Sequence, residues 1–372
     1  MWPSTGARRA SPLLPRLLYA RPCGDEHVLP GQPRGDVHGS NSPLRDDGGH
    51  RARVAVRDAA TVCQSVQKDL VTAATIEKKD KSPVTVADFA SQALVCASLA
   101  ANSKVSEVVG EEDAAELRES GAEETRDKVI EHVRGVRGAD VSPDQALDWI
   151  DLGGVTPSDK TPQYWTLDPI DGTKGFLRGQ QYAIALGLLE HGRIQVGVLG
   201  CPNLPGPDGQ LGCLLTATRG GGAQILPLTG KGFEGAKDIR VSDITDAAAA
   251  RFCESVESGH SDQDQSAQIA KALGITEEPV RVDSQCKYAI VGQGLAQIYL
   301  RLPTRADYRE KIWDHAAGLI VVEEAGGRVT DVRGHDLDFG HGRQLENTRR
   351  RALAVASATM QWLARWAAMA LT

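Results

Sequence analysis

Hydrophobic and polar positions change period several times along this chain, as they do in proteins that mix helices with strands. The spacing over 53–74 predicts an amphipathic helix. Short apolar runs predict buried strands over 105–109 and 163–167, and the runs 183–189 and 193–199, separated by Glu-His-Gly, predict a β-hairpin. Hairpins beside helices at irregular intervals disfavour a repeated βαβ unit and indicate an α/β (α+β) protein of layered sheets and helices.

Two breaks in this patterning divide the chain. Proline and glycine make up 14 of the first fifty residues, which predicts a disordered extension over 1–52. Glycines at Gly220–Gly222 and a stretch rich in proline and glycine over 227–235 interrupt the periodicity again, so we place a lobe boundary there. The predicted organisation is an N-terminal α+β lobe over 53–230 and a C-terminal α/β lobe over 231–372.

The two ends of the chain bear on location. The first 24 residues contain four arginines and no acid, which is typical of an organelle transit peptide; an unstructured tail or a wrong start site are the alternatives. We expect a cytoplasmic protein, with a mitochondrial location as the alternative. The apolar stretch 352–371 is interrupted by polar residues, so it predicts a strand over 352–356 and an amphipathic helix, not a membrane span.

Composition narrows the class of partner. The 372 residues are 41% hydrophobic and 24% charged, which is normal for a globular protein that buries its own core. The net charge of −7 excludes bulk nucleic acid as a partner but allows a small phosphorylated substrate at a local site. Seven dispersed cysteines without a CxxC pair predict free thiols in a reducing compartment.

The most informative segment is the run Asp-Pro-Ile-Asp-Gly-Thr-Lys-Gly that begins at Asp168. The predicted strand delivers Asp168 to its end, and Asp171 follows three residues later, so both carboxylates can converge on a hard cation. The carbonyl of Ile170 could add a ligand, and Gly172 permits a close approach of the backbone to a phosphate. A simple Asp-Gly turn is the alternative. The DxxD spacing excludes haloacid dehalogenase chemistry, which needs DxD, and the calcium-loop pattern DxDxDG is absent.

Three further acidic segments are candidates for the same chemistry. Glu111 and Glu112 follow the predicted strand at 105–109, although acids after a glycine often only begin a helix. Asp314 opens an apolar helical stretch and could be a simple N-cap. Asp88 follows a lysine-rich segment that could meet an anionic substrate.

The motifs GEE, DPIDGT and WDHAAG, in this order, resemble those of the lithium-sensitive, magnesium-dependent phosphatase superfamily, which includes inositol monophosphatase and fructose-1,6-bisphosphatase. The segments KKDKSPVTVAD, VESGHS, VDSQCKYA and IYLRLP resemble the 3′(2′),5′-bisphosphate nucleotidase branch. The likeness covers about residues 53–358. It implies a layered αβαβα sandwich of the inositol monophosphatase type.

The resemblance also implies roles for individual residues. The implied magnesium ligands are Glu111, Asp168, the Ile170 carbonyl, Asp171 and Asp314. The implied catalytic residues are the water-activating pair Asp88 and Thr173, with Glu112 as an acid near that water. The implied substrate-binding residues are Gly172, Thr173, His260, Ser284, Lys287 and Arg301.

The activity implied by the resemblance is magnesium-dependent hydrolysis of 3′-phosphoadenosine 5′-phosphate to AMP and phosphate, which supports sulfur metabolism and is sensitive to lithium and sodium. Whether the phosphosulfate analogue is also a substrate stays open. We expect a monomer with no membrane partner. The alternatives are another phosphatase of the superfamily, acting on an inositol phosphate or fructose 1,6-bisphosphate, and a nucleotide sensor without catalysis.

Overall fold

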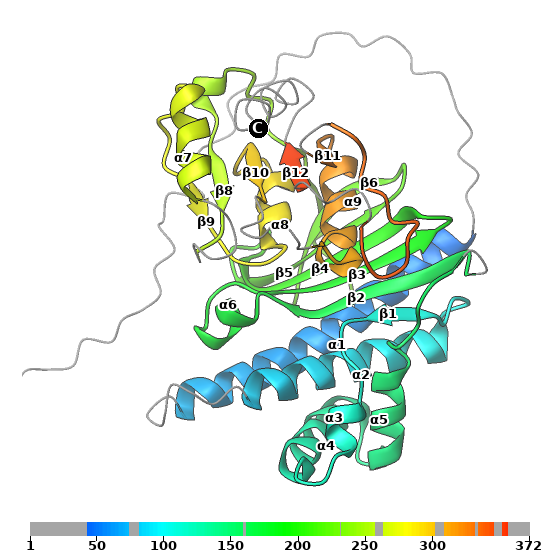
Figure 1. Cartoon of the computed structure of the whole chain (residues 1–372). Coiled ribbons are helices and arrows are strands. Elements are labelled where there is room, and N and C mark those ends of the chain that lie inside the picture. The colour runs from blue at the N-terminus through cyan, green and yellow to red at the C-terminus, as the bar shows by residue number, and fades with distance from the viewer. Residues whose placement is uncertain are drawn as a thin grey trace, which may run out of the picture. The chain divides into compact units, whose positions relative to one another are not determined.

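The computed structural model describes eight stretches of the chain, namely 43–73, 82–158, 161–230, 232–256, 263–301, 309–331, 334–345 and 352–355. All of them belong to one unit, Asn41–Thr372 (Figure 1). Most of the extension predicted over 1–52, and the helix predicted after residue 356, lie outside these stretches. None of the described helices combines the length and the apolar character needed to cross a membrane.

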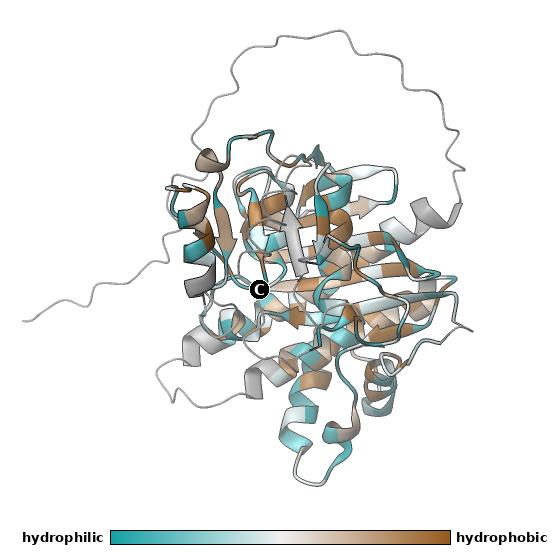
Figure 2. Cartoon of the chain, turned by 45° about the horizontal axis from the view of Figure 1, so that its top comes forward, coloured by the Kyte–Doolittle hydropathy of each residue, from teal (hydrophilic) through white to brown (hydrophobic). Residues whose placement is uncertain are grey.

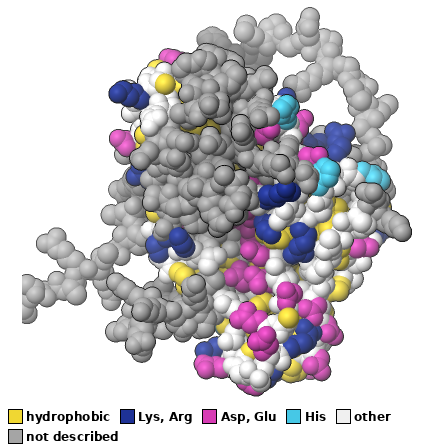
Figure 3. All heavy atoms as spheres, in the orientation of Figure 1, with side chains coloured by type: hydrophobic (Ala, Val, Ile, Leu, Met, Phe, Trp, Pro, Cys, Tyr) yellow, Lys and Arg dark blue, Asp and Glu magenta, His cyan; other side chains and the backbone are white. Residues whose placement is uncertain are grey.

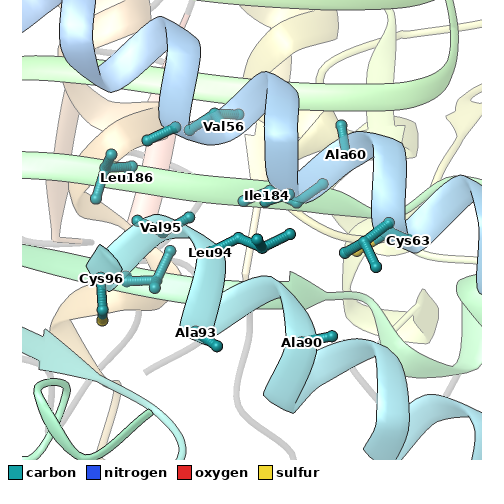
Figure 4. Close-up of a cluster of buried hydrophobic side chains, with 14 of the residues drawn as sticks. Val56, Ala60, Cys63, Ala90, Ala93, Leu94, Val95, Cys96, Ile184 and Leu186 are labelled. Carbon is teal, nitrogen blue, oxygen red and sulfur yellow. The ribbon is translucent and has the colours of Figure 1, made fainter. Parts of the chain in front are cut away.

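Two long helices, α1 (Pro43–Ala73) and α2 (Ser82–Asn102), pack against each other and cover one face of the larger sheet (Figure 1). Ala60 of α1 and Ala90 and Ala93 of α2 are buried in the same hydrophobic core. Leu94 and Ile184 fill the space between α2 and the sheet (Figure 4). This packing anchors α2, the helix that carries Asp88.

The predicted start of α1 at residue 53 was wrong by ten residues. The polar and glycine-containing sequence before Arg53 shows no helical periodicity, but distant parts of the chain hold it in place. The ring of His50 meets the ring of Phe233 edge-to-face, with 5.1 Å between centroids, and the Arg53 guanidinium lies 4.6 Å from the same ring. Tertiary contact therefore extends the helix beyond its sequence signal.

The larger sheet has seven described strands in the order β1-β2-β3-β4-β5-β6-β7. Only β1 and β2 run parallel; the other neighbours are antiparallel. The strand bounds are β1 Val108–Gly110, β2 Gln163–Asp171, β3 Ala183–Glu190, β4 Arg193–Pro205, β5 Leu211–Thr218, β6 Gly222–Pro227 and β7 Lys237–Asp238. The predicted hairpin is confirmed as β3 and β4, paired from Glu190 and Arg193 across the turn.

A smaller sheet has the order β11-β12-β10-β8-β9. Its strands are β8 Phe252–Glu254, β9 Val280–Arg281, β10 Ile298–Leu300, β11 Arg328–Asp331 and β12 Ala352–Val355, and the last confirms the strand predicted near the C-terminus. The remaining helices are α3 Ala115–Arg118, α4 Glu123–Arg137, α5 Pro143–Asp151, α6 Thr173–Leu177, α7 Gln263–Ala272, α8 Cys286–Gly292 and α9 Ala316–Glu324, with 3₁₀ turns η2 Ala247–Ala249 and η4 Ile312–Asp314.

The elements stack in five layers. Helices α1 and α2 cover one face of the larger sheet, and α9 packs on the other face with α8 beside it (Figure 1). Helices α8 and α9 also contact the smaller sheet. Helix α7 packs on that sheet through Ile269. The predicted αβαβα sandwich is thus confirmed. The predicted division into lobes at residue 230 stays a prediction.

Hydrophobic residues concentrate in the strands and in the central helices, while hydrophilic residues follow the loops (Figure 2). The six cysteines in the described stretches are all buried and carry free thiols. None of these stretches therefore relies on a disulfide for its stability, as the size of the core leads one to expect.

Candidate active site

A β-bulge places the first two candidate acids. Side chains alternate between the faces of a regular strand, so residues three apart would point to opposite sides. In β2, Asp168 pairs with Ala185 and Asp171 with Ala183, which leaves one extra residue in β2 between the two pairs. The bulge therefore returns Asp171 to the face of Asp168. Asp168 is 3% exposed, and its Oδ1 atom has no hydrogen-bond partner within the described structure.

Two more acids reach this cluster from other elements. Because β1 and β2 are parallel and Gly110 pairs with Leu167, Glu111 emerges beside Asp168 at the same sheet edge. Asp314 ends the 3₁₀ turn η4, which contacts both β2 and β3. The structure thus brings together the four side chains that the resemblance implied as metal ligands.

Burial and mutual repulsion shift the pKa values of these carboxyl groups. Burial first, then the charges of Glu111, Asp171 and Asp314, raises the pKa of Asp168 well above its usual value. The side chain of Glu111 is exposed to solvent on one side, but neighbouring groups remove part of the water around its carboxyl group. This desolvation, and then the charge of Asp314, raise the pKa of Glu111 to about 8. Burial and Glu112 likewise raise the pKa of Asp88. Such a concentration of acids, with an unpartnered buried oxygen, fits a hard cation.

Without a bound cation, the protein should lose stability as the pH rises from about 4.5 to about 8. Because the folded pKa values lie above those of the unfolded chain, the folded state keeps protons that the unfolded chain releases near pH 4. The protonated carboxyl groups contribute their full stabilisation below about pH 4. This stabilisation is lost as the pH rises through the pKa of each group in the folded protein, which is about 8 for Glu111. Melting temperatures in a chelating buffer at pH 5.5 and 8.5 test this, and a flat or rising trend would contradict it. With a divalent cation present the slope should shrink.

The implied water-activating pair lies beside the acids but is not joined. Asp88 is buried in α2 at 8% exposure, whereas Thr173 is exposed at the start of α6. No hydrogen bond connects these two side chains in the part of the chain that the structure describes. The role of the pair stays a prediction.

The implied nucleotide residues lie next to the acid cluster. Ser284 has a φ of 66°, a strained backbone conformation that places the start of α8 beside the β2–α6 turn. A Cβ atom on Gly172 would lie 2.8 Å from the Ser284 Cβ, so only glycine fits there. Lys287 is 5% exposed, and its Nζ lies 5.3 Å from the centre of the Tyr299 ring. His260 lies outside the described residues.

Arg301 is held by two acids. Its Nη2 lies 3.1 Å from Asp314 Oδ2 and 2.9 Å from Glu310 Oε2. Glu310 also contacts the buried His315 through Nε2 at 3.2 Å, and His315 Nδ1 lies 2.7 Å from the Tyr288 hydroxyl. The ligand atoms of Glu310, Asp314 and His315 lie within 4.8 Å of one another, but the guanidinium already supplies the positive charge there. This group is therefore an ion-pair network rather than a second metal site.

Sequence reasoning missed Glu310 and the buried glutamines Gln92 and Gln285. Only Glu310 left a signal, because an acid four residues before Asp314 stands in a short polar segment. The glutamines carry no charge and stand among residues that looked more reactive.

Acidic side chains are frequent on one part of the visible surface. Figure 3 shows Asp and Glu side chains gathered over α3 to α5 on the visible face, below the central part of the molecule. The exclusion of bulk nucleic acid stays a prediction.

A sequence profile described as the inositol monophosphatase family matches residues 50–365. The chain belongs to this family. Members of the inositol monophosphatase family are metal-dependent phosphatases, in agreement with the acid cluster. The resemblance drawn from the three motifs is confirmed.

Relatives within the family are more specific. A 3′(2′),5′-bisphosphate nucleotidase of Emericella nidulans is 44% identical over 79% of this chain and 90% of its own length. One of Oryza sativa is 46% identical over 79% of this chain and 86% of its own length. The solved inositol monophosphatase of Anabaena (Nostoc) sp. PCC 7120 superposes with a TM-score of 0.56 at 20% identity, covering 88% of this chain and 96% of that one, which supports the fold alone.

Proposed function

We propose that this phosphatase is a magnesium-dependent 3′(2′),5′-bisphosphate nucleotidase that converts 3′-phosphoadenosine 5′-phosphate to AMP and phosphate. The observation that carries the proposal is the convergence of Glu111 and Asp171 on Asp168, whose buried Oδ1 atom has no hydrogen-bond partner in the described structure. Nucleotidases that share 44–46% of their residues with this chain support the choice of substrate.

The donor set favours magnesium. All the candidate side chains offer carboxylate oxygens, which hard divalent cations prefer, and no sulfur or imidazole ligand stands among them. Glu111, Asp168, Asp171 and Asp314, with the carbonyl of Ile170, would hold the ion. When bound, magnesium supplies charge neutralisation at the phosphate and lowers the pKa of a coordinated water.

The chain's own residues would prepare the attacking water. In this proposal the Thr173 hydroxyl orients the water, and the Asp88 carboxylate accepts its proton. Burial and the charge of Glu112 raise the pKa of Asp88, which makes its carboxylate a stronger base than that of an exposed aspartate. The water would attack phosphorus in line, and the nucleoside oxygen would leave on the opposite side, taking a proton from solvent water, without a covalent enzyme intermediate.

Positive groups next to the acids would select a doubly phosphorylated substrate. Arg301 is 24% exposed at its side chain, whereas Lys287 is almost entirely buried, so Arg301 is the more accessible partner for the second phosphate. A guanidinium also matches a phosphate with two parallel hydrogen bonds. Lys287 would act as a point charge behind it, and Ser284 and His260 would contact the nucleoside.

Phosphate release from a small panel tests the proposed function. With magnesium present, 3′-phosphoadenosine 5′-phosphate should be hydrolysed at least about tenfold more efficiently than inositol 1-phosphate, because a site that pairs two phosphates loses at least about 1.4 kcal/mol without the second. Fructose 1,6-bisphosphate has two phosphates but no nucleoside for Ser284 and His260 to contact, so it should also be the poorer substrate. Millimolar lithium should inhibit. A preference for inositol 1-phosphate would move the chain to another branch of the family. Nucleotide binding without phosphate release would identify a sensor.

Two coarser expectations complete the proposal. We propose that the protein works as a monomer, and its mass in solution tests this. We propose a cytoplasmic or mitochondrial location, which N-terminal sequencing of the native protein would resolve.

A further inference from the structure

Two buried glutamines lie directly behind the loops that carry the candidate metal ligands. Gln92 in α2 is 0% exposed, and Gln285 at the start of α8 is 2% exposed. Each side chain uses both its amide nitrogen and its amide oxygen on backbone groups of other segments. A buried amide must find such partners, but nothing requires them to flank the acids.

Gln92 fixes the loop of Glu111. Its Nε2 donates to the carbonyls of Glu112, at 2.6 Å, and Ile150, at 2.8 Å. Its Oε1 accepts the Glu112 N–H at 3.1 Å. Both backbone groups of the residue next to Glu111 are thus bound to one side chain.

Two glycines show that this position of Gln92 leaves no spare room. A Cβ on Gly110 would lie 2.5 Å from Gln92 Oε1, and a Cβ on Gly153 would lie 2.4 Å from its Nε2. Each amide atom is therefore enclosed by backbone, and three hydrogen bonds prevent it from moving aside. The glycine before Glu111 is explained by this contact.

Gln285 contacts both Asp171 and the residue next to Asp314. Its backbone N–H donates to Asp171 Oδ2 at 2.6 Å. Its side-chain Nε2 donates at 2.8 Å to the carbonyl of Trp313, the residue before Asp314, and its Oε1 accepts the Gly318 N–H of α9 at 3.1 Å. One residue therefore sets the position of Asp171 relative to Asp314, although the two lie 143 positions apart in the sequence.

We propose that Gln92 and Gln285 are positioning residues that hold the carboxylates in place for the cation, acting through the backbone beside the ligands. The proposal rests on the proposed function, because it requires the metal site. Carboxylates at this density repel one another, so the loops that carry them need neutral anchors. An amide provides several hydrogen bonds and adds no charge to a site whose affinity depends on its charge.

Gln297 offers a matched control. It is also buried, at 4% exposure, and it also bonds two backbone groups, accepting the Arg251 N–H at 2.8 Å and donating to the Gly294 carbonyl at 3.4 Å. Neither partner adjoins a candidate ligand. Replacing Gln297 therefore removes the same kind of hydrogen bonds from the core without touching the site.

The test compares Gln92→Met, Gln285→Met and Gln297→Met in the full-length protein. Melting temperatures are measured in chelator and over a magnesium titration, and phosphate release from 3′-phosphoadenosine 5′-phosphate is measured over the same titration. All three variants should lose stability in chelator. Only Gln92→Met and Gln285→Met should need about 10–100-fold more magnesium for half-maximal effect in both assays, the range that outer partners of metal ligands contribute. The KM for nucleotide at saturating magnesium should stay within about twofold.

Failure of the positioning role and failure of the proposed function give different results. Equal magnesium requirements in all three variants would overturn the proposal and leave the glutamines as ordinary core residues. A wild-type protein that neither melts higher with magnesium nor releases phosphate would instead overturn the proposed function. If a methionine variant does not fold, Gln92→Asn or Gln285→Asn, which keeps an amide but shortens its reach by one methylene, should show the same magnesium shift.

Discussion

Asp168→Asn should lose magnesium-dependent turnover by more than about 100-fold, because it removes a charged ligand and such a loss exceeds that of an outer partner. The same change should raise the melting temperature of the protein in chelator. Burial and neighbouring acids raise the pKa of Asp168, so its ionised form destabilises the metal-free fold at pH 7.5, and a neutral amide removes that cost. The increase in melting temperature produced by magnesium should shrink accordingly.

Asp140→Asn is the matched control for this experiment, since Asp140 is an exposed acid in a turn outside the site. It should leave turnover and both melting temperatures nearly unchanged. Near-normal turnover by Asp168→Asn would remove Asp168 from the metal site. A variant that is inactive but less stable in chelator would show that repulsion among the acids is not what limits the metal-free fold.

Gly175→Ala should destabilise the protein by roughly 1–3 kcal/mol or more, the range of overpacking in a rigid core. A Cβ at this position would lie 2.1 Å from the backbone oxygen of Gln181 and 3.3 Å from the Cβ of Asp283. A backbone oxygen cannot rotate away, so α6 must move away from the segment that joins it to β3. Because α6 carries Thr173, kcat should fall as well.

Gly135→Ala provides the opposite expectation from the same substitution. Gly135 lies inside α4, and no atom lies within 4 Å of the position that its Cβ would occupy. Alanine there should raise the free energy of unfolding by about 0.5–1 kcal/mol, because it reduces the conformational freedom of the unfolded chain and favours the helix. Chemical denaturation measures both variants, and a stable Gly175→Ala would contradict the packing described for α6.

Local patterns predicted what local geometry determines. The hairpin of β3 and β4 follows from two apolar runs and a turn, and the strand before Asp168 follows from its apolar sequence. The bulge between Asp168 and Asp171 left no pattern of its own, because its position depends on pairing with β3. The early start of α1 depends likewise on Phe233, which lies far along the chain.

The candidate site was found through motifs rather than through geometry. Resemblance named Glu111 and Asp314 together, but nothing in their spacing shows that a parallel strand pair and a 3₁₀ turn bring them to one place. The glutamines behind them could not be predicted at all. A neutral side chain reveals its function only through the backbone groups that it binds.

An ion held by Asp171 and Asp314 would also stabilise the fold, because it would join two distant parts of the chain. A metal held by both residues would close a loop of well over one hundred residues that includes β3 to β10. The unfolded chain does not assemble these ligands, so the ion would stabilise the protein by binding the folded state alone, by an amount that grows with its concentration. In a chain whose described cysteines are all free thiols, such an ion would be a reversible cross-link between the end of β2 and the turn η4.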